Sequence, residues 1–491
     1  MGTNRKIFET QLYDIWKKKQ YESDLKTLDG DDVDILDIGV QELDTGGPDF
    51  KNARIRIGNL TYVGDIEIDN DYRDWKTHGH NIDNKYNKVI LHASLSNKFN
   101  QPYVYTKEGR KVPSICLDRF IDENLISKVE KKINVTVGES QLKCSSKIES
   151  VPNNIKEKLL TDLGIERFKK KCNKVHKRLK ELIYINELKI KEPVFKYDLP
   201  PDFDEKPVDK TKFQTKEIWE QVFYEMLFEA LGYSKNKLIM MNLARSVRMD
   251  FIKKFRNEKN YLELIETALF GVGGLLPKEN EIIPEKMSAY VSRLVRDWQV
   301  LKKIYDGRTY NEPDWHFFKL RPQNFPTIRL AAGARFLYQI SEKNFVGVIS
   351  KKLSEIRNLT VLINSLRSLF VMKAEGFWSQ HFVFNKPGNT DIKYFVGAAR
   401  ADEIVVNVVL PLFAVYYEIF GDKKTAKKIY KLYTIYKQKS DNKIVRDVAE
   451  EIKMSEQVKR TVYSQGMIEL FRNYCSKNKC VECLIGKQVF S

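Results

Sequence analysis

The 491-residue sequence contains only six cysteines and six histidines, and it has no apolar run long enough to cross a bilayer. So few cysteines exclude a disulfide-stapled scaffold, and we expect reduced thiols or metal ligands and no disulfide-linked partner. The longest apolar stretch, Ile404–Tyr417, contains Asn407 and Pro411 and is typical of a buried helix, so no membrane association is expected. Residues 1–11 carry charges and no apolar signal region, which favours a cytoplasmic protein.

Positive charge is abundant. The formal net charge is +18, and such an excess favours polyanions by attraction and counterion release. Nucleic acid is therefore the expected partner, with solubility of a lysine-rich chain as the alternative explanation. Hydrophobic residues make up 42% and aromatic residues 12% of the chain, which is enough to fill several cores and excludes wholesale disorder.

The chain is too long for a single core, and its patterning predicts an α+β fold in four parts. Residues 1–120 have the pattern of a small α/β domain. Residues 121–215 form a basic helical connector and linker, and residues 216–474 show only helical periodicity. Residues 475–491 are a cysteine-rich tail.

Short strands follow a first helix that carries Leu12 and Trp16 at helical spacing. Ala53, Ile55 and Ile57 alternate with arginines, which is the period of a half-buried strand. A Gly-Asn turn and a returning strand follow, and then a nearly continuous apolar run typical of a central strand. The predicted strands are residues 33–40, 53–57, 62–69 and 89–95, followed by a hairpin over residues 103–112.

Acidic residues gather around the predicted hairpin. Asp49 precedes its first strand, and Glu67 and Asp69 share one face of the second. The two strands bring Asp49 and Glu67 to the same end, and Glu9 lies on the leading helix. Carboxylates suit Mg²⁺ or Mn²⁺, which activates water and stabilises the leaving oxygen in phosphodiester cleavage. We therefore predict Glu9, Asp49 and Glu67 as metal ligands.

Pro48-Asp49, a hairpin and Glu67 together resemble the PD-(D/E)xK nuclease superfamily. Nearly the whole chain also resembles bacterial domain-of-unknown-function family 2851. The segments that carry this second resemblance are Gly46–Ile57, Gly64–Ala93, Ala268–Leu276, Phe317–Ala331, Val406–Tyr417 and Tyr474–Gly486. The superfamily resemblance implies a restriction-endonuclease-like domain with a catalytic lysine two residues after Glu67. Asp69 occupies that position, so it either adds a metal oxygen or marks a site that has lost catalysis.

Two histidines follow these acidic residues in the sequence. His78 and His80 in a His-x-His pattern share one face of an extended segment, and with Asp83 and His92 they form an alternative Zn²⁺ or Mn²⁺ site. Beside the carboxylates, His78 and His80 would instead carry protons or contact phosphate. The predicted catalytic residues are Asp49, Glu67, Asp69, His78 and His80, and the positive group in place of lysine is Lys76, Lys88 or one of the three histidines.

The tail contains Cys475, Cys480 and Cys483, a spacing that holds Zn²⁺ or an iron–sulfur cluster. The fourth ligand would be Cys144, Cys172 or Cys116. Free thiols are the alternative.

Candidate nucleic-acid-binding residues are Arg54, Arg56, Lys76, Arg321 and Arg329. Arg321 and Arg329 flank Pro326 at a predicted helix start, where a phosphate-binding face or inter-helix pairing are both open.

Three hypotheses for function follow. The first is a metal-dependent nuclease-like enzyme, and the second is a catalytically silent nucleic-acid-binding module. The third is a hydrolase of small substrates that uses His78, His80 and Asp83.

Overall fold

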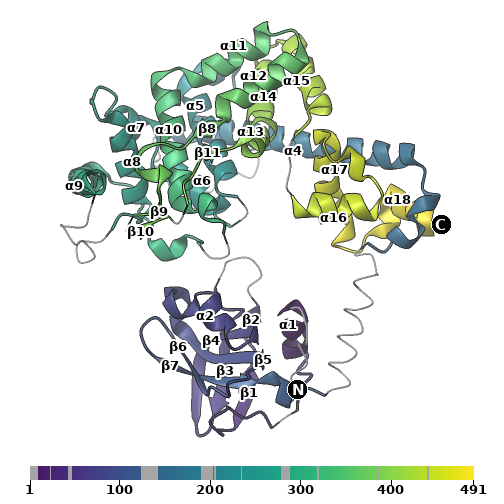
Figure 1. The fold of residues 1–491 in the computed structure, drawn as a ribbon. Coiled ribbons are helices and arrows are strands. Elements are labelled where there is room, and N and C mark those ends of the chain that lie inside the picture. Colours follow the sequence, from purple (N-terminus) through teal and green to yellow (C-terminus); the bar gives the residue numbers. More distant parts are fainter. Residues whose placement is uncertain are drawn as a thin grey trace. The chain divides into compact units, whose positions relative to one another are not determined.

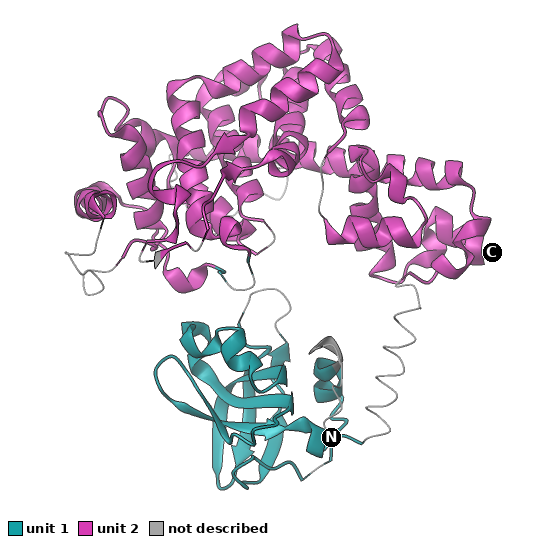
Figure 2. Cartoon of the chain, in the orientation of Figure 1, with its two compact units in different colours: residues 1–139, 316–320 teal, residues 140–315, 321–491 magenta. Residues whose placement is uncertain are grey.

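The computed structural model describes most of the chain. The described residues are 9–22, 24–41, 47–122, 142–188, 203, 206–233, 235–277, 288–317, 320–384, 386–388, 390–438 and 442–490, with the side chains of 9–11 and 386 left out. The chain divides into two compact units (Figure 2). The first comprises residues 1–139 and 316–320, and the second comprises residues 140–315 and 321–491.

The first unit is built on one mixed sheet (Figure 1). Its strand order is β1-β3-β4-β5-β7-β6, with β2 paired to β3. The pairs β3–β4 and β6–β7 are antiparallel, whereas β5 runs parallel to both β4 and β7. The strands are β1 Val33–Asp37, β2 Val40–Gln41, β3 Phe50–Ile57, β4 Leu60–Asp71, β5 Val89–Ser96, β6 Tyr103–Tyr105 and β7 Lys111–Cys116.

Strand alternation gives this sheet one apolar and one polar face. Ile66, Ile68, Leu91 and Ile115 are buried on the apolar face, which α1 (Glu9–Lys17) covers with Leu12, Ile15 and Trp16 among others. The opposite face carries acids, histidines and serines, and a small second core packs there. Its members are Trp75, Tyr86, Val89, Val104 and Val112. A polar sheet face is thus buried.

The segment between β4 and β5 supplies two of these core residues. It contains α2 (Asp74–Thr77) and two 3₁₀ turns, η1 (His80–Ile82) and η2 (Asn84–Lys88). The Trp75 indole N–H donates to the carbonyl of Tyr105 at 3.0 Å, which ties the segment to β6.

The second unit is mostly helical, as the sequence predicts for this part of the chain. Its helices are α4 Asn153–Glu187, α5 Lys216–Leu231, α6 Lys237–Ser246, α7 Met249–Lys253, α8 Tyr261–Val272, α9 Ala289–Ile304, α10 Pro326–Glu342, α11 Phe345–Glu355, α12 Leu359–Phe370, α13 Ala398–Ile404, α14 Leu410–Ile419, α15 Lys423–Ile435, α16 Lys443–Glu451, α17 Thr461–Leu470 and α18 Leu484–Phe490. Two small two-stranded antiparallel sheets pair β8 (Met372–Lys373) with β11 (Tyr394–Val396) and β9 (His381–Val383) with β10 (Lys386–Pro387). None of the described helices is long and apolar enough to cross a bilayer.

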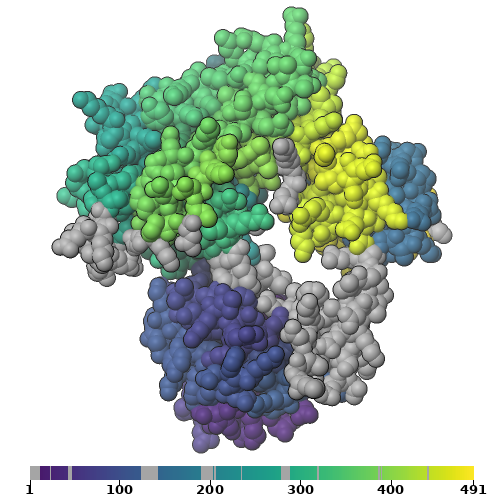
Figure 3. Space-filling model, in the orientation of Figure 1, coloured from purple at the N-terminus to yellow at the C-terminus, as the bar shows by residue number. Residues whose placement is uncertain are grey.

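Helix α4, which the sequence analysis assigned to a connector, belongs to the helical unit and packs on α17. Figure 3 shows the blue residues of this region beside the yellow C-terminal segment. Gly164 and Gly466 lie where the two helices cross, and a β-carbon on either would meet a carbonyl oxygen of the other helix at 2.1 Å. The glycines therefore permit a close backbone approach. Within the predicted connector and linker, residues 189–202, 204 and 205 lie outside the described residues.

The basic residues of α4 are largely paired within the fold. Arg178 donates two hydrogen bonds to the buried carboxylate of Glu225, at 2.8 and 2.9 Å. Burial raises the pKa of Glu225, but Arg178 and Arg245 outweigh it and hold the pKa below its ordinary value. Lys171 is bound to Asn407 and Gln465. Many basic side chains of α4 thus hold this helix against neighbouring parts of the helical unit.

Candidate metal centre

The β3–β4 hairpin brings Asp49 and Glu67 to the same end, as the sequence predicts. The backbone N–H of Asp49 donates to Glu67 Oε2 at 3.1 Å, and that of Ile68 donates to Asp49 Oδ2 at 2.9 Å. A bulge between Phe50 and Ala53 places Asn52 in the left-handed region, with φ of 56°. This irregularity bends β3 at the point where the carboxylates meet.

Acidic side chains recur at every second position of β4. Asp65, Glu67 and Asp69 lie on the polar face, and all three are buried. Neighbouring strands continue the polar face, because Glu67 pairs with His92 and Asp69 pairs with Ser94. Burial raises the pKa of Asp65, which the Asn52 N–H and the lysines Lys51 and Lys88 only partly offset.

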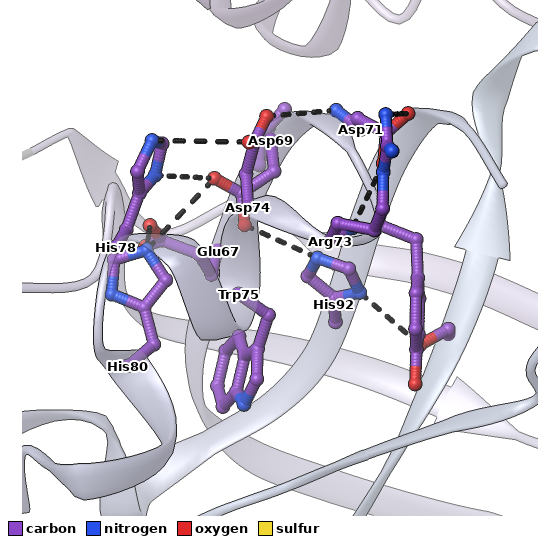
Figure 4. Close-up of polar contacts among 12 residues, drawn as sticks. Glu67, Asp69, Asp71, Arg73, Asp74, Trp75, His78, His80 and His92 are labelled. Atoms are coloured by element: carbon purple, nitrogen blue, oxygen red, sulfur yellow. Dashed lines mark hydrogen bonds and ion pairs between the residues drawn. The ribbon is translucent and has the colours of Figure 1, made fainter.

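Both histidines of the His-x-His pattern converge on Asp69 (Figure 4). His78 follows α2, and Gly79, with φ of 79°, turns the chain so that His80 begins η1. His78 Nδ1 lies 3.3 Å from Asp69 Oδ1, and His80 Nε2 lies 3.9 Å from the same oxygen. His80 Nε2 is also 3.0 Å from Glu67 Oε1. The rings converge because of this turn, not because they share one face of an extended segment.

These donors fit a single metal ion. One ligand atom from each of Asp69, His78 and His80 lies within 4.8 Å of the others, a group found among the described residues. Bonds of about 2.1 Å at tetrahedral or octahedral angles place donor atoms about 3.0–3.4 Å apart, so small side-chain movements close the set. We name this group, together with the adjacent Glu67, the carboxylate–histidine site. It differs from the predicted ligand set of Glu9, Asp49 and Glu67.

His92 holds the second oxygen of Asp69. Its Nε2 lies 3.2 Å from Asp69 Oδ2 and its Nδ1 lies 3.2 Å from Ser114 Oγ, all fully buried. A carboxylate only accepts, so Nε2 donates to Asp69. Burial raises the pKa of Asp69, but the hydrogen bonds from His78, His80 and His92 outweigh it and hold the pKa well below its ordinary value.

Tyr86 and Trp75 pack against the site. The rings of Tyr86 and His80 have centroids 4.0 Å apart, and Trp75 packs edge-on against His80 and His92. Burial raises the pKa of Tyr86, and nearby carboxylates, Glu67 and Asp49 foremost, raise it further. The phenol therefore faces the acidic cluster. No sequence signal marked it, since an isolated tyrosine between strands carries no motif.

Among the described residues, the other predicted site residues are not members of the carboxylate–histidine site. Glu9 begins α1, but its side chain lies outside the described residues. Arg54 and Arg56 are exposed on β3, on the same sheet face as Glu67, and Lys76 is exposed on α2. Arg321 is exposed, whereas Arg329 is buried.

The guanidinium of Arg329 is bound within the helical unit. It donates to the carbonyl of Phe395, the hydroxyl of Tyr233 and Oδ1 of Asn324. Burial lowers its pKa to about 10. These contacts give Arg329 a structural role within the helical unit.

A comparison with protein families gives a match over most of the chain. The matching model is described as Protein of unknown function (DUF2851) and covers residues 9–187 and 204–443. The chain belongs to this family. The DUF2851 match includes every residue of the carboxylate–histidine site and ends before Cys475. Comparisons with curated proteins and with solved structures gave no match.

Proposed function

We propose that the first unit is a metal-dependent hydrolase that cleaves phosphodiester bonds in nucleic acid. The observation that carries this proposal is the convergence of Glu67, Asp69, His78 and His80 on a buried sheet face, with Asp49 anchored beside them. Buried carboxylates and imidazoles grouped this closely are more typical of a functional site than of a packing core, because their burial is costly without a ligand.

Asp69, His78 and His80 would hold a divalent cation. Two imidazoles and one carboxylate favour Mn²⁺ or Zn²⁺ over Mg²⁺, which prefers oxygen ligands. The bound cation would lower the pKa of a water molecule and stabilise charge on the phosphate. Glu67 lies 3.0 Å from His80 Nε2 and is positioned to accept a proton from that water. His92 fixes the orientation of Asp69.

A nuclease site also needs a positive charge where the superfamily has its lysine. Pro48-Asp49, the hairpin and Glu67 follow the superfamily pattern, and Asp69 stands where a lysine is usual. Here His78 and His80 lie against Asp69, so the cation that these three residues would hold supplies the positive charge that Asp69 lacks.

Charge favours a polyanionic substrate. Acidic residues outnumber basic ones in residues 1–139, so the excess of +18 belongs to the helical unit. Within the first unit, Arg54 and Arg56 share the sheet face of Glu67. Arg54 pairs with Val63, which lies about 13 Å along β4 from Glu67. We propose that these arginines contact phosphates on one side of the scissile bond while the helical unit binds the strand.

A second candidate is a hydrolase of small phosphorylated or acyl substrates. The low exposure of the site favours it, because Glu67 and Asp69 are only 5% and 1% exposed, while His78 is the more open ligand. A small substrate reaches such a site more easily than a duplex does.

The test is to incubate the purified full chain with Mn²⁺ and single- or double-stranded DNA or RNA, and separately with a small aryl phosphodiester. We expect cleavage of polymer, reduced at least about 100-fold in an Asp49→Ala, Glu67→Ala double variant. Asp65→Asn changes a buried acid on the same face and serves as the matched control. Cleavage that survives in the double variant would refute the proposal, and cleavage of the aryl ester alone would establish the second candidate instead.

A further inference from the structure

Four cysteines from distant parts of the sequence lie together in the helical unit. They are Cys144, Cys475, Cys480 and Cys483, and we refer to them as the four-cysteine group. All six cysteines of the chain are free thiols. The thiols of Cys480 and Cys483 interact electrostatically with that of Cys144, and all three interact with Cys475. Of the three candidates for a fourth ligand, Cys144 is the one that joins the tail. Cys172 has Glu418 and Tyr430 as its neighbours, and Cys116 is buried with its thiol donating to the Leu95 carbonyl.

Packing of short helical segments creates this arrangement. Cys144 immediately precedes the 3₁₀ helix η4 (Ser145–Ser150), and Cys483 immediately precedes α18. Helix α18 contacts both η4 and α4, so the two cysteines begin neighbouring helices. Gly486 on α18 lies against Cys480, where a β-carbon would approach the Cys480 carbonyl oxygen at 2.0 Å. The glycine permits the close loop that carries Cys480 and Cys483.

The surroundings of the sulfurs suit thiolate ligands. The backbone N–H groups of Ile485 and Gly486 donate to the sulfur of Cys483, and Lys487 and Lys156 lie near Cys483 and Cys144 respectively. Such N–H donors and cations stabilise thiolates bound to iron or zinc. Without a cation, burial and the neighbouring sulfurs raise the pKa of Cys144 to about 11 and that of Cys475 to about 12. A bound cation instead favours the deprotonated thiolates.

The distances between the sulfurs distinguish a single zinc ion from an iron–sulfur cluster as the bound group. Zn–S bonds of about 2.3 Å in a tetrahedron place four sulfurs about 3.8 Å apart. Among the described residues, which include all four cysteines, no three of the sulfurs lie within 4.8 Å of one another. A cluster of several irons spreads its thiolates farther than one ion does. The tail also has the Cys-x4-Cys-x2-Cys spacing that serves plant-type clusters, where a distant cysteine completes the set.

We propose that the four-cysteine group binds an iron–sulfur cluster. The cluster joins the start of α4 to the end of the chain, which are also connected by the α4–α17 crossing. It shares no residue with the carboxylate–histidine site. The proposal stands whether or not the first unit cleaves nucleic acid.

The experiment is anaerobic purification of the full chain, followed by reconstitution with ferrous iron and sulfide. Iron, acid-labile sulfide and zinc are measured per chain, with visible absorption and paramagnetic resonance of the reduced protein. The variants are Cys480→Ser and Cys144→Ser, with Cys116→Ser as the control. Cys116 donates a hydrogen bond to the carbonyl of Leu95, which serine can also donate.

We expect iron and sulfide in equal amounts in the wild type and in Cys116→Ser, with the iron-to-chain ratio giving the cluster type. Cys480→Ser and Cys144→Ser are expected to lose most of both while their circular dichroism keeps the helical signal. One zinc per chain in place of iron and sulfide would overturn the cluster. A wild type that binds neither metal would overturn the site, and full iron retention in Cys144→Ser would remove that cysteine from it.

Discussion

The close crossing of α4 and α17 predicts an unusual effect of a glycine-to-alanine change. Alanine has the higher helix propensity, so Gly466→Ala would by itself stabilise α17 by about 1 kcal/mol. In this structure, however, the new β-carbon would lie 2.1 Å from the carbonyl oxygen of Leu160 on α4. The helices must separate by about 1 Å to restore ordinary contact, which sacrifices a quarter to a half of the dispersion energy along the crossing.

The net effect follows from these opposing terms. Overpacking against backbone commonly costs about 1–3 kcal/mol, and here it cannot be relieved by rotating a side chain. The Tyr433 hydroxyl also donates to the Gly164 carbonyl at 2.9 Å, a bond strained by the same displacement. After adding about 1 kcal/mol for that hydrogen bond and subtracting the gain in propensity, we expect Gly466→Ala to destabilise the helical unit by about 1–3 kcal/mol.

Urea denaturation measures this change as a lowered midpoint at unchanged slope. Gly397→Ala is the matched control, because a β-carbon there meets nothing within 4 Å. We expect the control to lie within about 0.5 kcal/mol of the wild type. A Gly466→Ala protein at least as stable as the wild type would refute the close crossing.

Other predictions concern buried charge and the two proposed sites. Glu225→Gln should destabilise the helical unit by about 1–3 kcal/mol at neutral pH, because it removes the buried negative charge shared by Arg178 and Arg245, although Glu181 still pairs with Arg178. Glu187→Gln in an exposed pair should change the stability by under about 0.5 kcal/mol. Since the folded pKa of Glu225 is lowered, its contribution to stability is present above the ordinary glutamate pKa and is lost only as the pH falls through the folded pKa. Denaturation at decreasing pH should therefore show the free energies of unfolding of the variant and the wild type converge. His92→Phe should weaken Mn²⁺ binding about 10–100-fold in calorimetric titration, and equal affinity would remove His92 from the site. Arg54→Ala, Arg56→Ala should reduce the salt dependence of nucleic-acid binding by about one charge per arginine, and an unchanged slope would exclude these contacts.

Strand periodicity made much of the first unit predictable. Alternation of Ile55 and Ile57 with arginines identified β3, and the alternating acids of β4 indicated that Glu67 and Asp69 share a face. The meeting of Asp49 with Glu67 followed because a hairpin brings its two ends together. These are local consequences of a period of two residues.

The centre of the site was less accessible from sequence. Asp69 replaced an expected lysine and therefore seemed to weaken the site, although it is the residue on which His78, His80 and His92 converge. That convergence depends on the left-handed turn at Gly79 and on the fold of α2 over the sheet. Both are set by tertiary packing, which residue spacing does not encode.

Residue spacing also did not identify the fourth cysteine of the group. Spacing grouped Cys475, Cys480 and Cys483, but three other cysteines were equal candidates to join them. Only the packing of α18 on η4 distinguishes Cys144. The pairing of the basic residues of α4 was equally hidden from sequence, because their partners, such as Glu225 and Glu469, are supplied by helices distant in sequence.

Calorimetric titration of Mn²⁺ into the metal-free full chain and into Asp69→Asn protein tests the carboxylate–histidine site most directly. Asp65→Asn is again the control, since it removes a buried charge on the same strand face without touching the ligand group. We predict one strong site per chain in the wild type and in Asp65→Asn, and its loss in Asp69→Asn. Equal binding by the wild type and Asp69→Asn, or no binding by any of the three proteins, would contradict the account.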